Sequence, residues 1–189
     1  MSLWTQDEFD RIFAEHQALA ERFLMSDGKV IQKFLILGNI DTDTGKAGKT
    51  VFPVFVPNMP EGMDGEHAKH HLLGLVRKLC VDLDASGVLQ QSEVWIRDTT
   101  PESVRKHFPE ADPDKLDAWF DEGDNYERFR EKVKPREALI IMGEFQGVSK
   151  SALNIFTRTR GGKPILGEWD CRGETKGRFT RLLPGARGN

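Results

Sequence analysis

Apolar residues recur at three- and four-residue intervals in two stretches of the chain, and this spacing predicts two long amphipathic helices. In the first, residues 5–27, Thr5 and Glu8 have the spacing of a capping box, and Gly28 supplies a stop signal. The second covers residues 64–86 and ends before Gly87. Its apolar face consists of Leu72, Leu75, Val76, Leu79, Cys80 and Leu83.

Shorter apolar runs predict strands at residues 29–40, 50–56, 92–97, 136–146, 151–160, 163–171 and 176–183. Pro53 lies within the second strand and favours an edge position, because proline has no N–H to donate to a neighbouring strand. Since helices and strands come in blocks, we predict an α+β fold. Its sheet is expected to be largely antiparallel, with about six or seven strands and with one face covered by the two long helices.

Residues 100–133 interrupt the strands with an acidic segment that contains several short helical patterns. The whole chain has 189 residues, of which 38% are hydrophobic and 30% are charged. This length and composition fit one ordinary globular domain. We therefore predict a single domain over residues 1–183, a helical acidic insert at 100–133 before the C-terminal strands, and a loose tail at 184–189.

The longest unbroken apolar run, residues 138–142, is far shorter than the roughly 20 residues of a membrane-spanning helix. The acidic N-terminus lacks the basic and apolar regions of a signal peptide. The 2 cysteines form neither a disulfide framework nor a zinc site. We expect a cytoplasmic protein with reduced thiols, no cofactor and no membrane partner.

Charge is distributed unevenly, although the formal net charge is only -3. Residues 134–189 contain 11 Lys and Arg against 5 Asp and Glu, so the C-terminal third is basic. A turn at Gly161-Gly162 would place Arg158, Arg160 and Lys163 at the tip of one hairpin face.

Phe156 and Trp169 would lie behind these cations on the same face. Cations mixed with aromatic rings can bind an acidic protein or stack on nucleic-acid bases. In the alternative interpretation, the aromatic side chains belong to the core and the basic tip protects an exposed sheet edge from association.

His67 and His71 lie one helical turn apart at the start of the second long helix, beside Glu66. This spacing could support a metal site or acid–base hydrolysis in a cleft there. No third metal ligand follows from the sequence, and Lys69 would repel a cation, so a solvated polar helix face is the alternative. Gly45–Thr50 resembles the end of a phosphate-binding loop, but a strand follows it where that motif requires a helix.

Because no complete catalytic constellation is evident, we expect a non-enzymatic interaction protein that uses the basic-aromatic hairpin surface. Its partner would be an acidic protein or another copy of the chain. A metal-dependent or acid–base hydrolase using His67, His71 and Glu66 is the second hypothesis. Nucleic-acid binding through the basic C-terminal third is the third, and the negative net charge disfavours it.

Overall fold

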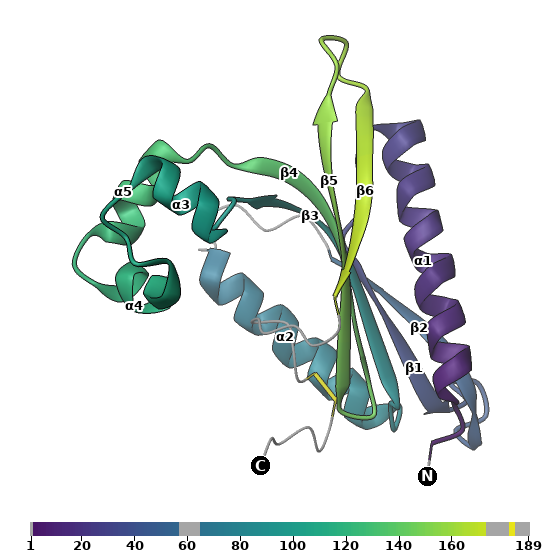
Figure 1. Cartoon of the computed structure of the whole chain (residues 1–189). Coiled ribbons are helices and arrows are strands. Elements are labelled where there is room, and N and C mark those ends of the chain that lie inside the picture. Colours follow the sequence, from purple (N-terminus) through teal and green to yellow (C-terminus); the bar gives the residue numbers. More distant parts are fainter. Residues whose placement is uncertain (1, 57–64, 173–181, 184–189) are drawn as a thin grey trace. The chain divides into compact units, whose positions relative to one another are not determined.

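The computed structural model describes residues 2–56, 65–172 and 182–183, apart from the side chains of residues 65, 66, 69 and 172 (Figure 1). Helices and strands alternate in blocks. Their order is α1 (Gln6–Asp27), β1 (Lys33–Ile40), β2 (Ala47–Phe55), α2 (Gly65–Asp82), β3 (Gly87–Ile96), α3 (Pro101–His107), η1 (Pro113–Lys115), α4 (Leu116–Asp121), α5 (Asn125–Lys132), β4 (Arg136–Phe145), β5 (Val148–Arg158) and β6 (Pro164–Arg172).

Helix α1 begins and ends where the capping signals predict. The Thr5 hydroxyl accepts from the Glu8 amide, and the Glu8 carboxylate accepts from the Thr5 amide at 3.0 Å. Gly28 adopts a left-handed conformation with φ 73° and donates its N–H to the Leu24 carbonyl at 3.0 Å. The predicted capping box and glycine stop are both confirmed.

The strands form one six-stranded antiparallel sheet in the order β2-β1-β3-β4-β5-β6, so the predicted α+β class is confirmed. Pro53 lies in the edge strand β2, as predicted, opposite Leu35. Val56 donates to the Gln32 carbonyl at 3.1 Å. Because hydrogen-bonded pairs alternate along an antiparallel ladder, the nitrogen of Pro53 then faces the open edge, where proline offers no donor.

The two faces of this sheet carry different cores. In β1, Leu35 and Leu37 pack with α1, whereas Phe34 and Ile36 pack with α2. Neighbouring residues of a strand point to opposite faces, so α1 and α2 lie on opposite sides of the sheet (Figure 1). The prediction that both long helices cover one face is therefore wrong. An unbroken apolar run is the pattern of a strand buried on both faces, and Phe34–Leu37 is such a run.

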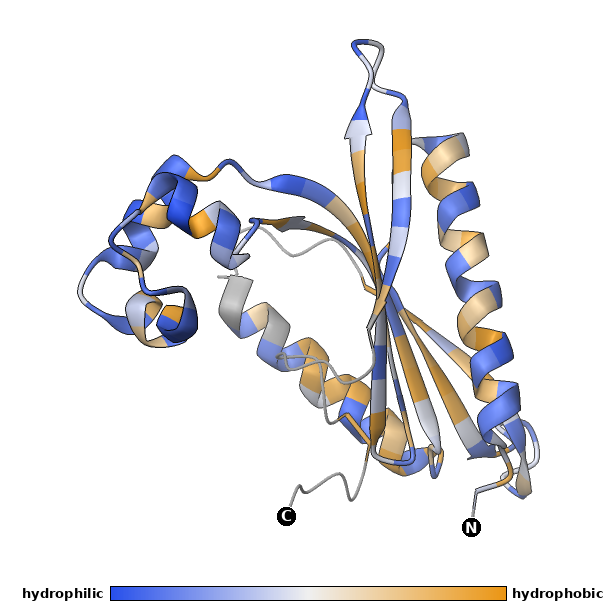
Figure 2. Ribbon diagram, viewed as in Figure 1, coloured by the Kyte–Doolittle hydropathy of each residue, from blue (hydrophilic) through white to orange (hydrophobic). Residues whose placement is uncertain are grey.

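The helix stripes match these two faces. The buried side of α1 consists of Phe9, Phe13, His16, Ala20 and Leu24. On the other face, α2 contributes Leu73, Val76 and Cys80 to a core that also includes Leu182 and Leu183. Apolar stretches are concentrated on the strands and along one side of each long helix (Figure 2).

The chain divides into two compact units: residues 1–93 with 139–189, and residues 94–138. The acidic insert predicted at 100–133 falls within the smaller unit and is helical, as expected. That unit has its own aromatic core, in which the Phe108 ring lies 5.1 Å from Trp119 and 6.4 Å from Phe129.

Strand β3 begins at Gly87, five residues before the predicted start. The hydrophobic pattern does not indicate this earlier start, because Gln90, Gln91 and Ser92 are polar although they occupy buried positions. The strand predicted at 176–183 and the tail predicted at 184–189 lie almost entirely outside the described residues. Among the described helices, none combines the length and apolar character needed to cross a membrane.

Candidate functional site

The hairpin formed by β5 and β6 closes through a loop at residues 159–163. Thr159 donates to the Lys163 carbonyl and Gly162 donates to the Thr159 carbonyl, both at 2.9 Å. Arg158 is therefore opposite Pro164, and Phe156 is opposite Leu166. The predicted two-residue turn implies a register that differs by one residue, and at the tip that register is wrong.

A bulge at Gly167 restores the expected pairing further from the tip, where Asn154 is opposite Trp169. The Asn154 side chain spans the bulge: its amide donates to the Gly167 carbonyl at 2.9 Å and its oxygen accepts from the Gly167 N–H at 3.1 Å. A Cβ atom at Gly167 would lie only 2.6 Å from the Ile155 carbonyl oxygen. Glycine is therefore required at this position.

The two aromatic residues of the predicted binding face belong to the core beneath α1. Phe156 is 2% exposed, and Trp169 is partly buried against the same cluster. The Trp169 indole N–H donates to the Glu21 carboxylate of α1. Phe156 is thus covered and cannot stack on a ligand, whereas Trp169 stays partly exposed beside it.

Arg158 is anchored at the end of β5 that leads into the hairpin tip. Its Nη1 donates to the Gly28 carbonyl at the end of α1 at 2.7 Å, and its Nη2 lies 3.6 Å from Glu93 Oε2 in β3. The other oxygen of Glu93 accepts from the Val30 N–H. Arg158 therefore acts as a brace that fixes the hairpin to α1 and to the sheet.

Beyond this brace, Arg160 and Lys163 are exposed in the loop at the hairpin tip, which extends past the C-terminal end of α1 (Figure 1). Lys29, which follows the Gly28 carbonyl that holds Arg158, is also exposed. None of these three cations forms an ion pair with a described residue. We call Lys29, Arg160 and Lys163 the tip cations.

His67 and His71 are both exposed near the start of α2, and the Glu66 side chain lies outside the described residues. Over the described ranges, no cluster of three or more His, Cys, Asp or Glu side chains is placed to hold a metal ion. Cys80 is buried, and its burial, together with the negative charge of Glu144, raises the pKa of the thiol to about 12. A thiol with this pKa is not a nucleophile at neutral pH.

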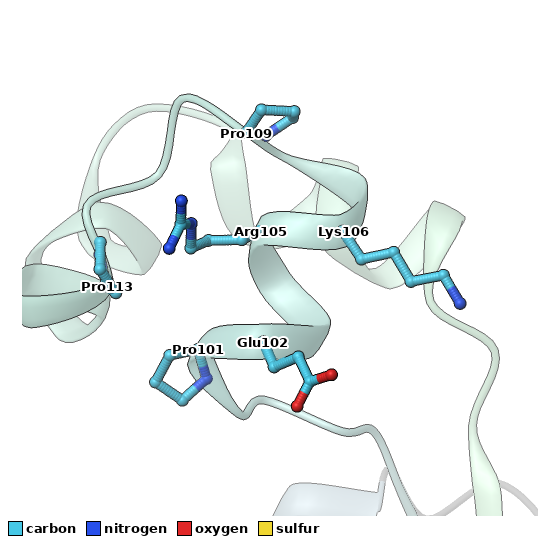
Figure 3. Close-up of a pocket in the computed structure, with 6 residues that line it drawn as sticks. All are labelled: Pro101, Glu102, Arg105, Lys106, Pro109 and Pro113. Atoms are coloured by element: carbon cyan, nitrogen blue, oxygen red, sulfur yellow. The ribbon is translucent and has the colours of Figure 1, made fainter.

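The helical unit carries a surface pocket of about 460 Å³ (Figure 3). Arg105 reaches across it toward Pro113, while Lys106 extends on the other side of α3. The sequence gives no signal for this pocket, because its prolines indicate only breaks between helices. Its lining residues are Pro101, Glu102, Arg105, Lys106, Pro109 and Pro113.

Three polar side chains that the sequence pattern does not indicate as buried lie on the α1 side of the sheet. His16, Lys33 and Gln91 are 3%, 9% and 1% exposed. Burial lowers the pKa of Lys33; burial first, and then the charge of Lys33, lower the pKa of His16 to about 4. His16 occupies an apolar position of the helical pattern, so the sequence gives no signal that distinguishes it from a core residue.

Comparison of the chain with protein-family models, with curated proteins and with solved structures finds no match in any of the three.

Proposed function

We propose that this chain is a non-enzymatic binding protein whose hairpin tip contacts an acidic protein partner. The observation that carries this proposal is the Arg158 brace, with contacts of 2.7 Å to the Gly28 carbonyl and 3.6 Å to Glu93. This brace supports the loop at the hairpin tip, in which Arg160 and Lys163 are exposed to solvent.

The brace matters because ordering a flexible loop costs free energy when a partner binds. A hairpin that is already fixed to α1 and β3 loses less conformational entropy on binding. Exposed cations that form no ion pair with a described residue also attract an acidic surface and increase the rate of encounter. An acidic protein surface is favoured over single-stranded nucleic acid, because Phe156, which would have stacked on bases, is buried.

A charge-reversal variant tests the proposal. The R160E/K163E protein and a fluorescein-labelled oligoglutamate peptide are used in an anisotropy titration at low salt. The expected result is a loss of affinity of roughly tenfold or more, since two attractive contacts become repulsive.

The matched control is R22E/R77E, which changes the net charge equally at two exposed arginines, one on each long helix. It should bind nearly as tightly as the wild-type chain. Equal losses in both variants would show that only net charge matters and would contradict a specific site at the tip.

A further inference from the structure

A row of side chains crosses the α1 side of the sheet at its edge. Phe55 of β2 is opposite Lys33 of β1, and Lys33 is opposite Gln91 of β3. Cross-strand partners point to the same face, and Leu35, two residues beyond Lys33, packs with α1 on that face. His16 approaches from α1, where the charge of Lys33 acts on it.

These polar groups are buried but incompletely paired. Gln91 Nε2 donates to the Ile31 carbonyl at 2.8 Å, which fixes the amide and leaves Gln91 Oε1 without a hydrogen-bond partner. His16 Nε2 also has none. Across the described part of the chain, Lys33 Nζ forms no hydrogen bond or ion pair. Two buried polar atoms without partners are costly unless a ligand or water satisfies them, and the unpaired Lys33 ammonium lies beside them.

An exposed apolar strip leads to this polar group. Val51, Pro53 and Phe55 are the residues of β2 opposite Leu37, Leu35 and Lys33, so all three face the α1 side. Val51 is 46% exposed and Phe55 is 60% exposed. The strip extends about 13 Å, since a strand advances about 3.3 Å per residue. Lys33 lies directly beside its Phe55 end.

Helix α1 leaves this strip open because it crosses the sheet obliquely. Near its N-terminus, Glu8 forms an ion pair with Lys49 of β2, whereas further along Glu21 accepts from Trp169 of β6. The helix therefore moves away from β2 along its length. The end of β2 at Phe55 is the part that it does not cover.

We propose that the apolar strip and Lys33 together bind an amphiphilic carboxylate, with its hydrocarbon tail along Val51, Pro53 and Phe55 and its head group at Lys33 Nζ. The ammonium has three N–H donors, enough to bind a carboxylate and Gln91 Oε1 at once. In its Nε2-protonated tautomer, His16 supplies a further donor to the anion. The head group thus satisfies the charge that the fold leaves unpaired.

The test uses dodecanoate, dodecanol and dodecylammonium as probes, each below its micellar concentration, with the full-length chain in calorimetric titrations. Dodecanoate should bind at least about tenfold more tightly than dodecanol, because a buried charge-assisted hydrogen bond contributes on that scale. Dodecylammonium should bind most weakly. The affinity of K33M for dodecanoate should fall to its affinity for dodecanol, and its affinity for dodecanol should equal that of the wild type.

K46M removes an exposed lysine of the loop before β2 and should keep the preference for the carboxylate. F55S should weaken the binding of dodecanoate and of dodecanol to the same extent, since it shortens the apolar strip. Thermal melting of K33M confirms that it is folded, and removal of an unpaired charge should not lower its melting temperature. Equal binding of the three probes, absence of binding, or an undiminished preference for dodecanoate in folded K33M would overturn the proposal.

Discussion

Arg158 Nη2 lies 3.6 Å from Glu93 Oε2, and this ion pair joins β5 to β3 across β4, the strand that separates them. Both side chains are largely buried, with 27% and 28% exposed. Glu93 also accepts from the Val30 N–H after the end of α1. The pair therefore holds together three segments that are distant in the sequence.

Replacement of Glu93 by alanine removes the acceptor for the Val30 N–H and the carboxylate that pairs with Arg158 Nη2. We expect E93A to lower the free energy of unfolding by about 1–3 kcal/mol, the usual cost of losing a hydrogen-bonded charged group. Urea denaturation measures the change. The control is E168A on the exposed edge strand β6, which should change stability by less than about 0.5 kcal/mol. Equal effects would contradict the brace.

The buried imidazole of His16 predicts a pH dependence of stability. Burial and the charge of Lys33 lower its pKa from 6.5 to about 4 in the folded protein. The unfolded chain therefore takes up the proton first as the pH falls. The free energy of unfolding is therefore highest above about pH 6.5, and it falls by about 3 kcal/mol in total as the pH is lowered towards 4.

Urea denaturation at a series of pH values from 7 to 4 tests this dependence. In H16L the free energy of unfolding should decline less over this range, by most of the roughly 3 kcal/mol expected from His16. H70Q, which changes an exposed histidine of α2, should retain the wild-type profile. A decline in H16L as steep as in the wild type would show that other groups cause it.

Gly167 predicts a sharp difference between two glycine substitutions. G167A would place a methyl group 2.6 Å from the Ile155 carbonyl oxygen, so it should destabilise the protein by about 1–3 kcal/mol. Gly74, inside α2, has no atom within 4 Å of the added Cβ. G74A should instead stabilise by about 0.5–1 kcal/mol, because alanine favours a helix interior. Thermal or urea denaturation of both variants measures these changes in stability. A G167A protein as stable as the wild type would contradict the bulge.

Pro53 predicts that the β2 edge resists pairing with another strand. Its nitrogen faces the open edge and offers no donor, so P53V should restore a continuous row of edge donors. We expect P53V to form dimers or larger species at concentrations where the wild type does not, measured by sedimentation velocity. P101A removes a proline from the helical unit and should leave the association state unchanged. An unaltered association state in P53V would show that the edge is protected in another way.

The sequence predicted the elements well because their signals are local. The capping box at Thr5, the stop at Gly28 and the edge position of Pro53 each depend on a few neighbouring residues. The sheet faces were not predicted correctly. The run Phe34–Leu37 is apolar on both sides, and it required a helix on each face rather than two on one.

The candidate site was harder to predict because it depends on register and on contacts between distant residues. Arg158 and Phe156 look equivalent in an alternating pattern, yet one braces the hairpin and the other is core. The loop at 159–163 shifts the register by one residue, and only the bulge at Gly167 corrects it. Nothing in the local sequence around Glu93 indicates its partners, and nothing around Lys33 indicates that this residue is buried.

The salt dependence of oligoglutamate binding tests the central claim about the tip cations most directly. Affinity of the wild-type chain for the labelled peptide is measured at several salt concentrations and compared with R160E/K163E. Because the contacts are exposed ion pairs, we predict that wild-type affinity falls steeply with salt and that the variant shows weak binding with little salt dependence. Wild-type affinity that does not change with salt, or an identical dependence in the variant, would contradict the proposed function.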